Sequence, residues 1–119
     1  EVRGEKRTVL AFQNRLAPIK IAVLPLLKNR ADIVEVARKL AADLRSVGKT
    51  VYDDTASIGR LYRRQDEIGT PYCVTVDVQS LDDRQATVRD RDSMRQVRIS
   101  LDGIKEYLRK SLAKGGLAD

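Results

Sequence analysis

Histidine is absent from this 119-residue sequence, and cysteine occurs once, at Cys73. Without histidine, the chain has no His-based catalytic triad and lacks the usual general base that titrates near neutral pH. One cysteine without histidine also excludes a zinc site of the usual ligand type. The turn after the first apolar segment, residues 25–32, contains no glycine, which excludes a Walker loop and a dinucleotide fingerprint at that position. We therefore expect no catalytic residue and no metal site within this chain.

Aromatic residues and long apolar runs are also scarce. The chain contains four tyrosines, one phenylalanine and no tryptophan, which disfavours sequence-blind binding of single strands, because that mode relies on stacked aromatic rings. No apolar run approaches the roughly 18 residues of a membrane span, so we expect no membrane partner. No signal peptide is visible at the charged start of the chain. The single Cys73 cannot form an internal disulfide, which fits a reducing, cytoplasmic setting.

The overall composition indicates one globular domain whose charge is unevenly distributed along the chain. Hydrophobic residues make up 42% and charged residues 34% of the chain, and the net charge is +6. Seven basic and two acidic residues fall within the first 30 positions, so the excess is mostly N-terminal. We interpret residues 1–18 as a linker or arm from an upstream catalytic core, residues 19–114 as the domain, and residues 115–119 as a frayed tail.

The order of apolar patterns predicts an α/β fold. Strands are expected at 19–27, 49–52, 72–78, 84–91 and 95–100, and helices at 31–47, 58–68 and 101–114, the last two capped by Ser57 and Ser100. Alternation of strands and helices favours parallel pairing of the first three strands through right-handed crossovers. The last two strands form a hairpin. We therefore expect a mixed five-stranded sheet, with an antiparallel hairpin at one edge, flanked by three helices.

Arginines and aspartates alternate along this hairpin, in the segment A-T-V-R-D-R-D-S-M-R-Q-V-R-I at residues 86–99. A four-residue loop at Asp92–Arg95 would place Arg89 opposite Arg98, and such like charges repel unless an anion lies between them. One side of the ribbon would then project into solvent, and it carries Thr87, Arg89, Arg91, Gln96 and Arg98. The other side carries Val88, Val97 and Ile99 toward the core.

This polar side has two interpretations. Arginine supplies donors and aspartate supplies acceptors, so the alternation suits the Watson–Crick edge of an unpaired base such as cytosine. Alternatively, the side chains extend into water or pair with nearby carboxylates, as charge-rich surfaces commonly do. The same two interpretations apply to Arg60, Arg63 and Arg64 on the second helix.

An acidic pair at Asp53 and Asp54 ends the second strand. Such a pair could hold Mg²⁺ in a small carboxylate-dependent enzyme, whose turnover Asp54→Asn would abolish. The simpler interpretation is that these aspartates cap and end the strand, because aspartate is favoured in turns.

Four segments of the chain resemble a known family. The stretches L-A-P-I-K (16–20), S-I-G-R (57–60), D-E-I-G-T-P-Y (66–72) and T-V-R-D-R-D-S (87–93) closely resemble the C-terminal anticodon-binding domain of glycyl-tRNA synthetase, a class II enzyme. The resemblance runs from about residue 9 to about residue 112. It implies the fold expected above and recognition of the anticodon of glycine tRNA, whose last two bases are both cytosine. It assigns the RNA contacts to Arg89, Asp90, Arg91, Asp92 and Ser93, and then to Arg60 and Arg64. Leu61 departs from the family, which often has arginine there.

The resemblance also implies the role of a longer protein. That protein would ligate glycine to its tRNA, with ATP and Mg²⁺ bound in a catalytic core that this chain does not contain. It would be a cytoplasmic homodimer, and the fragment alone would catalyse nothing. The alternative is the same fold used outside the synthetases, as a nucleic-acid-binding domain or a polymerase accessory subunit.

Overall fold

The computed structural model describes residues 18–118, so the predicted arm lies outside the described residues except for Pro18. The helices and strands follow one another in the order β1 (Ile21–Pro25), α2 (Ala31–Leu44), β2 (Thr50–Tyr52), α3 (Ile58–Ile68), β3 (Tyr72–Val76), α4 (Val78–Asp83), β4 (Gln85–Asp90), β5 (Gln96–Ser100) and α5 (Ile104–Lys114). None of the helices within residues 18–118 is long and apolar enough to cross a membrane.

The five strands form one mixed sheet in the order β2-β1-β3-β4-β5. β1 pairs in parallel with both β2 and β3, whereas β3–β4 and β4–β5 are antiparallel. The predicted fold class is therefore confirmed, including the three parallel strands and the hairpin at one edge. The structure adds a fourth helix, α4, to the three that were expected.

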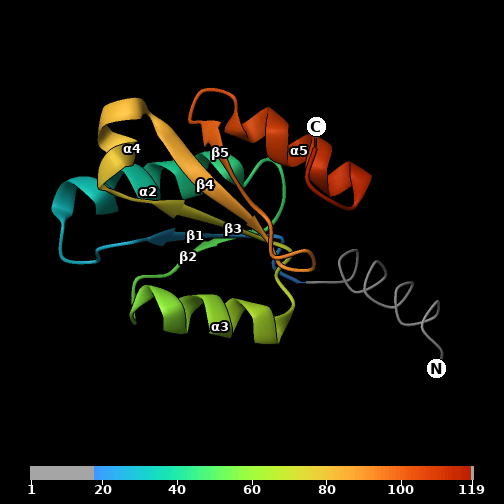
Figure 1. Cartoon of the computed structure of the whole chain (residues 1–119), viewed down its shortest axis with the longest axis horizontal. Helices are drawn as coiled ribbons and strands as arrows, with labels where there is room; N and C mark the ends of the chain where they lie inside the picture. The colour runs from blue at the N-terminus through green and yellow to red at the C-terminus, as the bar shows by residue number, and fades with distance from the viewer. Residues whose placement is uncertain (1–17, 119) are drawn as a thin grey trace.

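Different helices cover the two faces of the sheet, and the side chains of β1 reach the core on each face. Its side chains alternate: Ile21 and Val23 belong to the core under α2 and α5, and Ala22 and Leu24 belong to a smaller core under α3. Because successive side chains point to opposite faces, a strand buried on both faces is a continuous apolar run, as β1 is. Figure 1 shows α3 on one side of the sheet and α2 and α5 on the other.

Helix α3 ends where the sequence predicts. Ser57 is its N-cap residue, and Gly69 is its C-cap with a left-handed φ of 86°. Glycine adopts this conformation without the penalty that a Cβ atom imposes. The buried Thr70 hydroxyl donates to Gln65 Oε1 at 2.7 Å, which fixes the exit from the helix. The end of α3 is thereby held at the start of β3.

Helix α4 is the element that the sequence pattern did not predict. Asp77 caps it through a reciprocal pair of hydrogen bonds with Ser80, whose backbone N–H lies 2.9 Å from Asp77 Oδ1. Six residues are too few to show a helical period, so hydrophobic spacing carries no signal here. The Asp77 carboxylate also accepts a hydrogen bond from Arg98, so the cap connects α4 to β5.

Asp77 makes stability depend on pH in the acid range. Burial opposes its ionisation, but the bonds from Ser80 and the ion pair with Arg98 outweigh that effect and hold its pKa below the ordinary value. A carboxyl whose pKa is lowered by folding stabilises the protein above the unfolded pKa, near pH 4, and loses that contribution as pH falls through the folded pKa. We expect Asp77→Asn to destabilise at pH 6 by about 1 kcal/mol. In urea unfolding, this difference should shrink at pH 3; an equal difference at both pH values would contradict it.

The C-terminal region differs from its prediction in two details. Ser100 does not cap α5, because two further turn residues intervene and Gly103 is the N-cap. Residues 115–118 were expected to fray, yet Leu117 is buried against the larger core and the Ala118 N–H donates to Ser111 Oγ at 2.9 Å. The apolar Leu117 holds this segment against the end of α5.

Candidate functional site

The register of the β4–β5 hairpin differs from the expected one by two residues. Arg89 lies opposite Gln96, and Arg98 lies opposite Thr87. The predicted juxtaposition of Arg89 with Arg98 is therefore wrong, and with it the inference that an anion must separate two facing arginines. A shift of two residues leaves every side chain on its predicted face.

Asp90 explains the register. Its carboxylate accepts hydrogen bonds from the Asp92 N–H at 3.2 Å and from the Ser93 hydroxyl at 2.9 Å, while its own N–H donates to the Arg95 carbonyl. The turn therefore closes between Asp90 and Arg95, one residue earlier than expected. Asp90 is only 7% exposed. This aspartate, predicted as an RNA contact, is occupied in building the turn.

The two faces of the hairpin have the predicted character. Val88 is buried in the larger core, and Val97 and Ile99 pack against it. Side chains on the opposite face, toward α3, are polar, and we call them the hairpin face. Its members on the strands are Thr87, Arg89, Gln96 and Arg98.

Arg89 does not project into solvent, and that expectation is wrong. Its side chain is 8% exposed, and its two terminal nitrogens donate to the two oxygens of Asp66 at 3.0 and 3.2 Å. The guanidinium also lies over the Tyr62 ring, 4.9 Å from its centre, and contacts the Met94 sulfur at 3.1 Å. Both Asp66 and Tyr62 belong to α3, so the cation is held beneath that helix. The hydrogen bonds to Asp66 raise the pKa of the Arg89 guanidinium.

Arg91 connects the turn to the same end of α3. Its Nε donates to the Asp66 carbonyl oxygen at 3.0 Å, and one terminal nitrogen donates to Asp92 at 2.9 Å. Its backbone N–H donates to the Pro71 carbonyl. The side chains of Arg91 and Asp92 are 22% and 26% exposed, so both stay within reach of solvent. Ser93 in the turn and Gln96 at the start of β5 are exposed.

Arg98 occupies the other end of the hairpin face, beside α4. It donates to Asp77 at 3.1 Å and to both oxygens of Asp83 at 3.0 and 3.1 Å. Further bonds reach the Thr87 hydroxyl and the Gln85 carbonyl. Its Nε is buried without a hydrogen-bond partner among the described residues. Arg98 is thus fixed in one orientation with its side chain 28% exposed.

The α3 arginines are separate from this group. Arg60 is exposed on the outer side of the helix. Arg64 donates to Asp53 at 2.6 Å and to Thr55 at 2.8 Å. Asp53 also accepts from the Thr55 N–H and hydroxyl. The structure thus brings Arg89 and Arg91 together at Asp66, but it places Arg60 and Arg64 elsewhere on α3.

Asp53 and Asp54 make separate sets of contacts. Asp53 makes the turn contacts given above, whereas Asp54 accepts a hydrogen bond from the Tyr52 hydroxyl at 2.9 Å and lies 3.7 Å from Arg38. Within residues 18–118, no group of three or more His, Cys, Asp or Glu side chains is placed to hold a metal ion. These contacts favour a structural role for the pair over a Mg²⁺ site.

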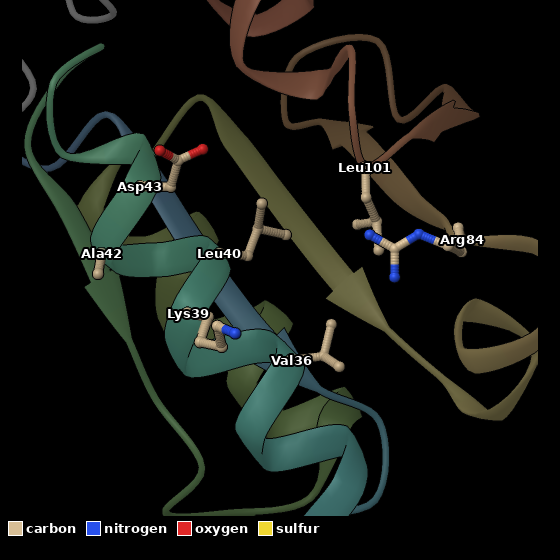
Figure 2. A pocket seen from close by; sticks show the side chains of 7 residues that line it. All are labelled: Val36, Lys39, Leu40, Ala42, Asp43, Arg84 and Leu101. Atoms are coloured by element: carbon tan, nitrogen blue, oxygen red, sulfur yellow. The ribbon is translucent and has the colours of Figure 1, made fainter.

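A cavity of about 660 Å³ lies on the other side of the sheet from α3. Figure 2 shows Val36 and Leu40 of α2 pointing toward Arg84 and Leu101 across this opening. Its lining is mainly apolar, and it includes no residue of the hairpin face.

Cys73, under α3, is buried, and burial raises the pKa of its thiol to about 12. A thiol with so high a pKa is a poor nucleophile.

The chemistry of the hairpin face follows from its pairing. Arg89, Arg91 and Arg98 each have a carboxylate partner, so they form a set of fixed donors beside fixed acceptors. A base edge presents both kinds of group, whereas a phosphate presents only acceptors. The arrangement therefore suits recognition of a polar, planar group better than general binding of polyanions.

Asp66 is the part of this site that the sequence pattern missed. It lies 23 residues before Arg89 in the chain, and only the fold brings the two together. Two signals pointed to it: it belongs to the D-E-I-G-T-P-Y segment, and it follows Tyr62 by one helical turn. Only the spacing from Tyr62 places it on a face of α3, and neither signal identifies Arg89 as its partner.

Comparisons with known proteins identify the family of this domain. The family described as "Anticodon binding domain" matches residues 20–111. Proteins named Glycine–tRNA ligase from Thermobifida fusca and Mycolicibacterium paratuberculosis are 56% and 57% identical over 92% and 87% of this chain. The chain spans only 23% and 22% of their lengths.

A solved structure shares the fold. It is titled as the RNA binding domain of threonyl-tRNA synthetase from Cryptosporidium parvum Iowa II, and it superimposes with a TM-score of 0.67 at 21% identity. The match covers 85% of this chain and 24% of that one. The resemblance noted in the sequence is thereby confirmed, and the chain belongs to the anticodon binding domain family.

Proposed function

We propose that this domain recognises the anticodon loop of a glycine tRNA, and that the hairpin face with its turn makes the contact. The observation that carries the proposal is the set of arginine–carboxylate pairs on that face, in a chain more than half identical to proteins named Glycine–tRNA ligase. Unpaired bases offer donors and acceptors on one edge, and these pairs offer the complement.

The residues proposed to serve RNA binding fall into an exposed group and a buried group. Gln96, Ser93 and the partly exposed Arg91, Asp92 and Arg98 are available to RNA. Arg89 and Asp90 are buried, so their proposed role is to hold the turn and the base-contacting groups in place. Arg60 and Arg64 on α3 would contact the phosphate backbone.

In the longer protein, the domain would serve a ligase that attaches glycine to its tRNA with ATP and Mg²⁺ bound in a separate catalytic core. We further propose a cytoplasmic homodimer. The residues of this chain would only select the tRNA. The relatives named Glycine–tRNA ligase favour this role over an accessory subunit outside the synthetases.

A binding titration tests the proposal. The 119-residue chain is titrated against an RNA hairpin that carries the anticodon loop of glycine tRNA, and against hairpins in which one of the last two anticodon cytosines is replaced by uridine. We expect each replacement to weaken binding about tenfold, within the range for loss of one bidentate base contact. Equal affinity for all hairpins at the same salt concentration would contradict base recognition.

A further inference from the structure

We propose that Asp66 is a specificity-determining residue of this site, which accepts a hydrogen bond from the exocyclic amino group of an anticodon cytosine. This inference rests on the proposed function and assigns one base contact within it. It differs from the sequence-based expectation, in which Arg89 and the aspartates of the turn read the base.

The two side chains of the Arg89–Asp66 pair differ in their exposure to solvent. The Asp66 side chain is 33% exposed and that of Arg89 is 8% exposed, so a base that approaches the pair meets the carboxylate first. Arg89 binds one side of the carboxylate through both oxygens. A carboxylate has about four acceptor positions, and the Arg89 bonds use two of them. The others remain available on the more exposed side.

Arg89 therefore acts as the positioning residue. Its two hydrogen bonds fix the plane of the carboxylate, and its contacts with Tyr62 and Met94 fix the guanidinium itself.

Arg91 completes the complement to cytosine. Its Nε is bonded to the carbonyl of Asp66 itself, so its guanidinium lies beside the Asp66 backbone. That bond and the one to Asp92 use two of the five guanidinium N–H groups. Cytosine presents an amino donor next to the N3 and O2 acceptors. Uridine presents a carbonyl oxygen in place of the amine. This oxygen would face the Asp66 carboxylate, and two acceptors repel each other.

The test is the ratio of affinities for the cytosine and uridine hairpins, measured with wild type and with Asp66→Asn. This ratio does not depend on the folded fraction of a preparation, because that fraction affects both hairpins equally. We expect the wild-type preference of about tenfold to fall to near one in Asp66→Asn, because an amide can also donate to the uridine oxygen. Glu106→Gln on α5 is the matched control. It removes one negative charge from an exposed ion pair with Arg109 and should leave the ratio unchanged.

Two further measurements cover the case in which Asp66→Asn does not fold. Asp66→Glu keeps the charge but displaces the carboxylate by one methylene, and it should lower the ratio several-fold. Wild type should bind a hairpin with 2-pyrimidinone, which lacks the amino group, about tenfold more weakly than the cytosine hairpin. If both variants keep the wild-type preference for cytosine, or if wild type binds the 2-pyrimidinone hairpin as tightly as the cytosine hairpin, the role of Asp66 is overturned but the proposed function is not. A wild type with no preference overturns the proposed function as well.

Discussion

The Leu61→Ala variant is expected to lose about 2–5 kcal/mol of unfolding free energy, the range for truncating a buried leucine. Leu61 is fully buried and is the apolar residue of α3 that lies entirely within the smaller core, beside Leu24 and Cys73. The same helix carries Asp66. We therefore expect α3 to shift on the sheet, so that the Arg89–Asp66 pair loosens and the preference for cytosine falls. Urea unfolding and the hairpin titration measure the two effects.

Leu108→Ala is the matched control for this prediction. Leu108 is equally buried, but it belongs to α5 and to the core on the opposite face of the sheet. Its replacement should cost a similar unfolding free energy. At a temperature where both variants remain folded, only Leu61→Ala should lose cytosine preference. An equal loss in both variants would mean that general destabilisation, rather than the position of α3, controls recognition.

Asp90→Ala is expected to release the hairpin turn and to cost about 1–3 kcal/mol, because it removes the acceptor of two partly buried hydrogen bonds. The carboxylate holds the Asp92 N–H and the Ser93 hydroxyl, and its loss removes what sets the register. Met94 adopts a left-handed φ of 62° in this turn, a conformation that favours glycine and needs support from its surroundings. Amide hydrogen exchange across residues 91–95 should accelerate, because the turn opens more often.

Asp102→Ala controls for the loss of an aspartate. The Asp102 side chain is 87% exposed and its ion pair with Arg84 spans 4.0 Å, so we expect a change below about 0.5 kcal/mol. If Asp90→Ala behaves like Asp102→Ala in both unfolding and hydrogen exchange, Asp90 does not build the turn.

The hydrophobic pattern was sufficient to predict the sheet and the faces of the hairpin. β1 is a continuous apolar run, whereas in β4 the apolar residues Ala86 and Val88 stand two positions apart, and this period survives a register shift of two residues. The register itself was not predicted, because it depends on the Asp90 side chain folding back onto the turn. α4 was missed because Asp77 and Ser80 define it by capping, and its six residues show no period.

The sequence predicted the hairpin as the candidate site but not the surroundings of each side chain. The alternation of arginine and aspartate pointed to the hairpin, and the structure places donors and acceptors there. Which of them reach solvent depends on α3, whose Asp66 and Tyr62 cover Arg89. That contact joins residues far apart in the chain, so local pattern contains no information on it. We therefore propose that exposed groups beside Arg89, rather than Arg89 itself, contact the base.

The most direct test of the central claim is an NMR titration of the ¹⁵N-labelled 119-residue chain with the glycine anticodon hairpin, observing arginine Nε–H and glutamine side-chain signals. The account predicts the largest shifts at Arg91, Gln96 and Arg98, and little change at Arg109 on α5. Shifts confined to Arg109 and the α2–α5 side, with the hairpin signals unmoved, would contradict it.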